Sequence, residues 1–342
     1  MRFLVISSPH GFSTRDVWKR VLAGLQANGA EAYPFDLLPR WRAFDLMLDL
    51  ARKAKVVMPE PFKSNLLAYE PIFGAAHYHE VDAVIVVSPQ YFPVPIADLL
   101  SKSGIKTIGY FTECPYEDTL IAPVQAAHFE YVMVNDRYSL GLYESFCDNV
   151  MYLPHSYDPV IHYPAPNPAE GERVVWVGSA YGSRRQFLHA IDWRGIDLEM
   201  YGLWNAMPSR WSLRPYVRDG AIENETAAEL YRQAAMSFSI HRSQRYIDMD
   251  WTIDEGEAYS ASPRTFELAA CGCFQISDFR QEVEDIFGDT VPIYQTPAEF
   301  GRLMRRALDD PVWREEVAKK QHQAIQGHDC ASRMATLLER VV

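Results

Sequence analysis

Short apolar segments alternate with helical patterns along the whole 342-residue chain. The segment from Val81 to Val87 is almost entirely apolar, as in a strand of a parallel sheet that helices cover on both faces. Similar strand patterns are Phe3–Ser7, Ile105–Phe111, Tyr131–Asn135, Asn149–Leu153, Val174–Val177, Leu198–Tyr201, Met236–Ile240, Cys273–Ser277 and Val291–Tyr294. Strands that alternate with helices build α/β folds. The pattern therefore predicts doubly wound parallel sheets, and the length of the chain predicts two domains.

A proline-rich segment interrupts this alternation near the middle of the chain. Five prolines fall between residues 154 and 172, and such clusters are typical of loops. We expect a Rossmann-like domain over residues 1–155, a linker over 156–172, a second Rossmann-like domain over 173–328 and a terminal helix over 329–342. The Gly-x-Gly-x-x-Gly fingerprint is absent after the first strand, so a dinucleotide cofactor is not indicated.

Charge and cysteine content restrict the possible partners and the compartment. The formal net charge is −12, which argues against nucleic acid as an obligate partner, because phosphate binding requires positive charge. Five cysteines without a Cys-x-x-Cys pair predict free thiols rather than a disulfide framework or a zinc site. The apolar N-terminal run is too short for a signal peptide, and no run approaches the roughly 20 apolar residues of a membrane span. We expect a cytoplasmic protein without a transmembrane segment.

The segment from Ser262 to Asp278 carries the most specific chemical signal. Ser262 followed by proline is the start pattern of a helix, and that start places Arg264 and Thr265 at a helix N-terminus. Free N–H groups and the helix dipole favour an anion there. Glu267 lies one turn further, and a carboxylate can accept two hydrogen bonds from a cis-diol. The arrangement suits a nucleoside diphosphate with its ribose, whereas the alternative for Glu267 is an exposed helical carboxylate.

This segment resembles the Arg-Thr-Phe-Glu…Ala-Cys-Gly signature of the CgeB-like glycosyltransferases (spore maturation CgeB type), which have the GT-B fold. Further motifs that look like those of the family are Val174–Ser179 with Arg184-Arg185, Tyr201-Gly202-Leu203-Trp204, and Ser239-Ile240-His241-Arg242 with serine in place of asparagine. The resemblance covers about residues 150 to 340. It implies two Rossmann-like domains facing across a cleft, with a terminal helix that crosses back to the N-terminal domain.

The resemblance also implies which residues bind the donor, a UDP-, GDP- or dTDP-sugar, without a metal or a further cofactor. These residues are Gly178, Ser179, Arg184, Arg185, Gly202, Trp204, His241, Arg242, Arg264, Thr265 and Glu267. Three alternatives stay open: surface arginines at 184 and 185, a core position for Trp204, and a strand-end pair at His241 and Arg242 that bonds nearby backbone. Many retaining GT-B enzymes carry a glutamate eight positions before the one matched by Glu267, where this chain has Tyr259.

The resemblance places the acceptor and the catalytic base in the N-terminal domain. Glu113, His10 and Asp118 lie near predicted strand ends there, and each has an alternative role as a loop-capping group. We expect transfer of a hexosyl or related group to an acceptor hydroxyl or amine. The acceptor can be a protein, a glycan, a lipid or a small molecule. Two alternatives are a nucleotide-sugar epimerase of the same fold and a non-catalytic nucleotide-sugar-binding protein.

Overall fold

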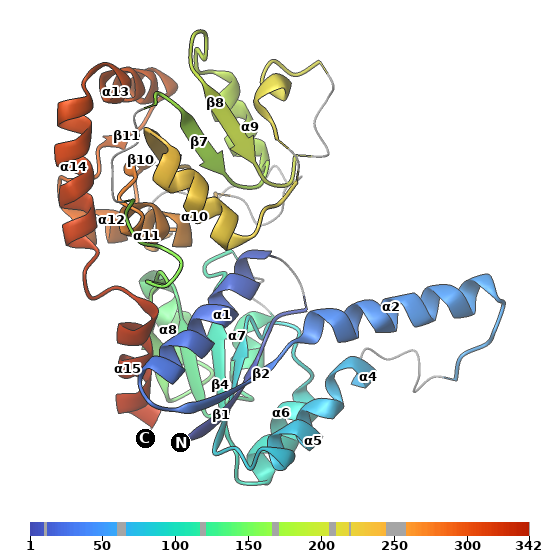
Figure 1. Ribbon diagram of the computed structural model, residues 1–342. Helices are drawn as coiled ribbons and strands as arrows, with labels where there is room; N and C mark the ends of the chain where they lie inside the picture. Colours follow the sequence, from blue (N-terminus) through green and yellow to red (C-terminus); the bar gives the residue numbers. More distant parts are fainter. Residues whose placement is uncertain are drawn as a thin grey trace. The chain divides into compact units, whose positions relative to one another are not determined.

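The computed structural model describes residues 1–9, 12–59, 66–116, 121–165, 171–204, 210–218, 220–243 and 258–341. The chain divides into two compact units, one formed by Met1–Pro154 with Ala331–Val342 and the other by His155–Cys330. Each contains one sheet, and the paired strands of both sheets run parallel. Figure 1 labels the helices and strands of both units.

The sheet of the first unit has the strand order β2-β1-β3-β4-β5-β6. Its strands are β1 (Arg2–Ile6), β2 (Glu31–Phe35), β3 (Ala83–Val87), β4 (Lys106–Phe111), β5 (Tyr131–Val134) and β6 (Val150–Tyr152). Its helices are α1 (Phe12–Ala27), α2 (Leu37–Lys53), α4 (Leu66–Tyr69), α5 (Pro71–Tyr78), α6 (Val94–Lys102), α7 (Ala122–Ala126), the 3₁₀ helix η1 (Arg137–Ser139), α8 (Leu140–Glu144) and α15 (Cys330–Val341).

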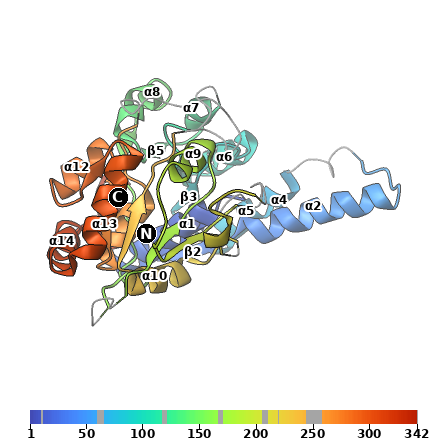
Figure 2. The same cartoon turned by 90° about the horizontal axis from the view of Figure 1, so that it is seen from above.

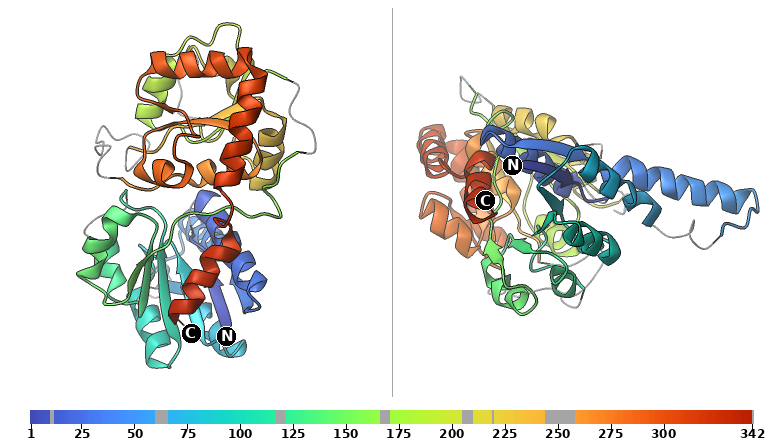
Figure 3. Two further views of the ribbon diagram at one scale, coloured as in Figure 1. Left: turned by 90° about the vertical axis from the view of Figure 1, so that its left-hand side faces the viewer. Right: turned by 90° about the horizontal axis from the view of Figure 1, so that it is seen from below.

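Helices cover both faces of this sheet, as its buried strands require. Helices α1 and α15 pack on one face, where Leu25 and Leu337 are fully buried beside Val5. Helices α2 and α4 to α8 pack on the other face. Helix α2 extends well beyond the sheet (Figures 1 and 2). The two chain ends lie close together because α15 returns to the first unit (Figure 3), where Lys106 Nζ donates to the carbonyl of Val341 at 2.5 Å.

The sheet of the second unit has the strand order β11-β10-β9-β7-β8. Its strands are β7 (Val174–Val177), β8 (Leu198–Tyr201), β9 (Met236–Ser239), β10 (Phe274–Asp278) and β11 (Ile293–Tyr294). Its helices are α9 (Gly182–His189), the 3₁₀ helix η2 (Arg214–Tyr216), α10 (Asn224–Gln233), α11 (Pro263–Ala270), α12 (Gln281–Phe287), α13 (Pro297–Asp309) and α14 (Pro311–Ala324). Helices α9 and α13 pack on one face and α10 and α11 on the other.

The two sheets share one topology, and this topology locates candidate sites. In each sheet the first strand lies between the second and the third, so the direction of winding reverses between β1 and β3 and between β7 and β9. Ligands of open α/β sheets bind beyond the carboxyl ends of the strands at such a reversal. The prediction of an α/β fold with two parallel sheets is confirmed. In each unit the reversal of winding is the candidate position for a ligand.

Candidate active site

Two glycines shape the reversal in the second unit. Gly178 follows β7 and Gly202 follows β8, and Gly202 has a φ of +132°, which L side chains rarely adopt. A Cβ atom on Gly202 would lie 2.1 Å from the carbonyl oxygen of Gly178. A Cβ atom on Gly178 would in turn lie 2.8 Å from Nη2 of Arg264. The turns after β7 and β8 therefore pack backbone against backbone, with an arginine beside them.

Arg184 holds the turn after β7 to the segment after β9. It lies in α9 and is only 6% exposed. Its Nε donates to the carbonyl of Ile240 at 2.9 Å, and its Nη1 donates to the carbonyl of Ser179 at 3.3 Å. The guanidinium groups of Arg184 and Arg242 lie 5.0 and 5.1 Å from the ring centroid of Tyr181. Arg184 is therefore a buried cation that organises the loops rather than a surface arginine, and Arg185 is half-buried.

Helix α11 brings a further cation and a carboxylate to the site. The helix begins at Pro263 after Ser262, as the sequence predicts, although the Ser262 side chain makes no capping hydrogen bond. Arg264 lies over the ring of Trp176 at 5.4 Å, and its buried Nη1 has no hydrogen-bond partner among the described residues. Glu267 is 7% exposed, so it is not a surface carboxylate. Thr265 is fully buried, and its hydroxyl lies 3.1 Å from that of Ser239, which joins α11 to β9.

His241 and Asp278 form a buried pair at the ends of β9 and β10. The backbone N–H of His241 donates to both carboxylate oxygens of Asp278, at 3.0 and 2.9 Å, and its Nδ1 lies 2.6 Å from Oδ1. Burial lowers the pKa of His241, and the charges of Arg280 and Arg184 act in the same direction. Burial opposes ionisation of Asp278, but interactions with His241 and Arg280 outweigh it and hold the pKa of this carboxyl below its usual range. The pair is therefore a carboxylate beside a neutral imidazole.

Trp204 and Tyr259 make contacts that account for their burial. Trp204 is 1% exposed and stacks on Trp211, with ring centroids 5.7 Å apart, and its edge meets Trp176 in the core. This is the core alternative for Trp204. Tyr259 is 4% exposed, and its hydroxyl donates to Asp285 at 2.5 Å. These contacts connect Tyr259 to α12.

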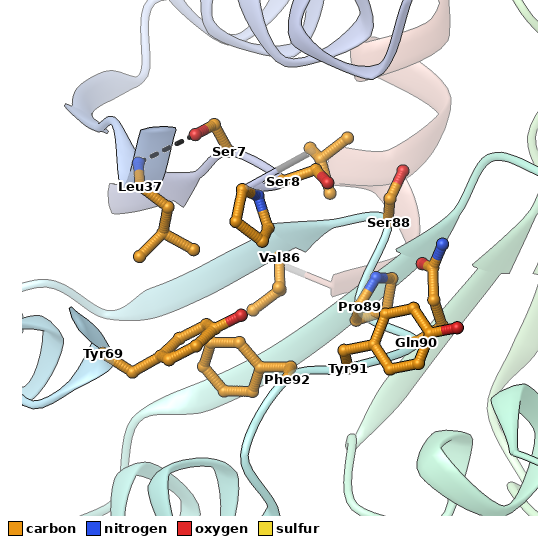
Figure 4. Close-up of a pocket in the computed structure, with 12 residues that line it drawn as sticks. Ser7, Ser8, Leu37, Tyr69, Val86, Ser88, Pro89, Gln90, Tyr91 and Phe92 are labelled. Carbon is orange, nitrogen blue, oxygen red and sulfur yellow. Dashed lines mark hydrogen bonds between the residues drawn. The ribbon is translucent and has the colours of Figure 1, made fainter. Parts of the chain in front are cut away.

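The reversal in the first unit contains a small pocket. Residues after β1 and β3 supply most of its lining: Ser7, Ser8, Pro9, Leu37, Tyr69, Val86, Val87, Ser88, Pro89, Gln90, Tyr91 and Phe92. The rings of Tyr69 and Phe92 lie together opposite Ser7 and Ser8 (Figure 4). Oε1 of Gln90 is buried and has no hydrogen-bond partner among the described residues. The pocket thus combines aromatic rings, hydroxyl groups and an available amide oxygen.

Of the three predicted catalytic bases, Glu113 lies among the described residues. Glu113 is half-buried in the turn after β4, beside Thr112, whose hydroxyl lies 2.5 Å from that of Ser88. Glu113 is not among the residues that line the pocket. His10 and Asp118 lie outside the described residues.

Sequence reasoning missed several residues of both sites. Asp278 could have been found, because it is a carboxylate at the end of a predicted strand beside the strand of His241. Gln90 and Tyr69 carried no such signal, since their association depends on how α4 and the turn after β3 pack.

Cation-ligand and membrane-span patterns do not occur in the described part of the chain. No group of three or more His, Cys, Asp or Glu side chains there could hold a metal ion. None of the helices described above combines the length and the apolar character that crossing a membrane requires. All five cysteines are free thiols; four are buried and Cys147 is half-buried.

The paired α/β units define the class of fold, which is that of the GT-B glycosyltransferases. Residues 184–339 match a family described as glycosyl transferase-like. This segment begins at Arg184 and includes His241, Arg264, Glu267 and Asp278. No curated protein matches the chain in sequence.

Solved structures with the same fold include proteins with bound nucleotides. Anabaena Alr3699/HepE in complex with UDP-glucose has a TM-score of 0.65 and 11% identity, with 99% of this chain and 98% of that chain covered. An α-glucosyltransferase in complex with UDP has a TM-score of 0.64 and 11% identity, with 99% of each chain covered. A glycosyltransferase from Rickettsia africae has a TM-score of 0.60 and 11% identity, with 99% and 97% covered. At this identity the likeness shows the fold.

Proposed function

We propose that the protein is a glycosyltransferase that moves a sugar from a nucleotide-sugar donor to an acceptor hydroxyl or amine. The observation that carries this proposal is that the family match and the candidate donor-site residues fall in the same segment of the chain. The segment that matches the glycosyl transferase-like family also supplies Arg184, Arg264 and His241 at the reversal of the second sheet. Neither an epimerase nor a non-catalytic binding protein is favoured by this match.

The donor site that we propose lies at the carboxyl ends of β7, β9 and β10. Transfer from a nucleotide sugar requires positive charge near the diphosphate that departs. Arg264 at the start of α11 would supply it, with Arg242 beside the same loops, while Arg184 holds those loops in place. Glu267 would accept hydrogen bonds from the ribose hydroxyls. Fixed guanidinium groups suit this task without a metal ion, so metal-independent transfer of a hexosyl or related group is part of the proposal.

The acceptor site that we propose is the pocket between the ends of β1 and β3. Its hydroxyl and amide groups can hydrogen-bond a polar group of the acceptor beside the aromatic rings. Glu113 follows the adjacent strand β4 and is the described residue that we propose as catalytic base. A carboxylate in that role would take the proton from the acceptor as the new bond to the sugar forms.

Thermal stabilisation by nucleotides tests the donor site. A ligand that binds only the folded protein raises its melting temperature. We would compare UDP-, dTDP- and GDP-glucose on the wild-type protein, on Glu267→Gln and on Glu229→Gln, an exposed glutamate of α10 that serves as control. One nucleotide sugar should stabilise the wild type and Glu229→Gln but stabilise Glu267→Gln much less. Absence of any shift in the wild type would refute the proposed function, and an equal shift in all three proteins would refute the role of Glu267.

A further inference from the structure

One nitrogen of the His241 side chain is satisfied by a neighbour, whereas the other is not. His241 is 4% exposed, and its Nε2 is buried without a hydrogen-bond partner among the described residues. Its other nitrogen, Nδ1, is held by Asp278 at 2.6 Å, which fixes the orientation of the ring. A buried polar atom without a partner costs free energy, so its presence calls for an explanation.

The charged groups around His241 indicate the charge of a ligand that would suit this position. Asp278 at the end of β10 faces it, and the cations are Arg184 from α9 and Arg280 just before α12. Arg280 Nη2 donates at 3.0 Å to the carbonyl of Arg242, which directly follows His241 in the chain. Tyr294 of β11 is also near but stays neutral, because burial raises its pKa well above the usual value and its hydroxyl donates to the carbonyl of Ser239 at 2.6 Å. The acidic residues between 247 and 257 lie outside the described chain.

This environment keeps the imidazole neutral until an anion arrives. One carboxylate and the guanidinium groups of Arg184 and Arg280 leave an excess of positive charge, and protonation of His241 would add to it. A bound diphosphate would reverse this balance, since an opposite charge nearby favours the protonated form of an imidazole. The Asp278 carboxylate would then hold the Nδ1–H of the imidazolium, and Nε2–H would become a charge-assisted donor.

We infer that His241, held by Asp278, binds the diphosphate of the donor through Nε2–H and takes up a proton when it does so. The inference rests on the proposed function, because it assigns a role within the donor site. It makes His241 a proton-linked ligand of the phosphates rather than a fixed cation like the arginines. The alternative role for a neutral imidazole is to accept a hydrogen bond from a sugar hydroxyl, which involves no proton uptake.

Calorimetric titration in buffers of different ionisation enthalpy measures this proton uptake directly. The probe is UDP-glucose, or the dTDP or GDP analogue if that binds more tightly, because both phosphates are esterified and do not titrate near neutral pH. At pH 7.5 we expect the wild-type protein to take up about half a proton or more for each donor bound, and its affinity to weaken as pH rises. His241→Gln should bind the donor roughly tenfold to a hundredfold more weakly, and its binding enthalpy should not depend on the ionisation enthalpy of the buffer.

Two further variants separate this role from a structural one. Asp278→Asn keeps the shape of the side chain but removes the charge that favours the imidazolium, so proton uptake should fall even where the protein folds normally. The control is His128→Gln, which removes a histidine that also lies beside an aspartate, with Nδ1 3.2 Å from Asp98, but is partly exposed in the first unit. This variant should bind the donor with the wild-type proton uptake.

The outcomes distinguish the inference from the proposed function. Donor binding by the wild type without proton uptake, or with the same uptake in His241→Gln, would overturn the inference and leave the proposed function standing. Failure of all three nucleotide sugars to bind the wild type would overturn both. Proton uptake that disappears in His241→Gln and falls in Asp278→Asn, while His128→Gln behaves as the wild type, would support the inference.

Discussion

Replacement of Gly202 by alanine tests whether the backbone packing at the donor site is as close as the structure indicates. The new Cβ would lie 2.1 Å from the carbonyl oxygen of Gly178, far inside van der Waals contact. Neither turn can retreat freely, because Gly178 N–H donates to Tyr201 at 2.8 Å and Gly202 N–H donates to Gly220 at 2.9 Å. The substitution must therefore shift backbone rather than the end of a flexible side chain.

Two costs add in this variant. Overpacking of a well-packed site costs about 1–3 kcal/mol. A φ of +132° is unfavourable for alanine, and backbone strain of this kind costs about 1–3 kcal/mol more. The free energy of unfolding of the second unit should therefore fall by about 2–6 kcal/mol, a large part of the stability of a typical domain.

Urea denaturation followed by tryptophan fluorescence provides the assay. With an m-value of about 2 kcal/mol/M, a loss of about 4 kcal/mol lowers the midpoint by about 2 M. The matched control is Gly301→Ala in the middle of α13, where a Cβ would meet nothing within 4 Å and alanine favours the helix by about 0.5–1 kcal/mol. A Gly202→Ala protein whose midpoint equals that of the wild type would refute the close approach of the two turns.

Four further predictions concern stability, reactivity and activity. Leu337→Ala in α15 should destabilise the first unit by about 2–5 kcal/mol in urea denaturation, because this fully buried side chain would leave a cavity; an unchanged midpoint would contradict the packing of α15. Burial raises the pKa of Cys271 to about 12 and that of Cys273 further, so neither thiol should react with a maleimide at pH 8 until the protein unfolds, as mass spectrometry can show. Because the pKa of His241 is lowered, the unfolded chain binds a proton more readily than the folded one, and stability should fall as pH drops below the ordinary value of 6.5. The lowered pKa of Asp278 extends this loss of stability below pH 3.8. Melting temperatures measured between pH 7 and 5 should therefore fall less in His241→Gln than in the wild type. Once an acceptor is found, EDTA should leave the rate of transfer unchanged, and a loss that added metal restores would refute metal-independent transfer.

The sequence by itself determined the fold class, because apolar strand segments that alternate with amphipathic helices can bury their apolar surface only in covered parallel sheets. It also located α11, since the Ser262-Pro263 start is a local signal that needs no tertiary contact. A helix start of this kind can be predicted from the sequence because it depends only on residues that are neighbours in the chain.

Only the tertiary structure decided which of these side chains are buried and what they contact. Arg184 lies in a segment whose sequence is typical of an exposed helix start, yet it is buried because it donates hydrogen bonds to the carbonyls of Ser179 and Ile240. Asp278 meets His241 because β9 and β10 are neighbours in the sheet, although 37 residues separate the two in sequence. Such contacts depend on strand order and on the packing of distant segments, and the free energy that fixes them comes from burial of the whole unit rather than from any local pattern.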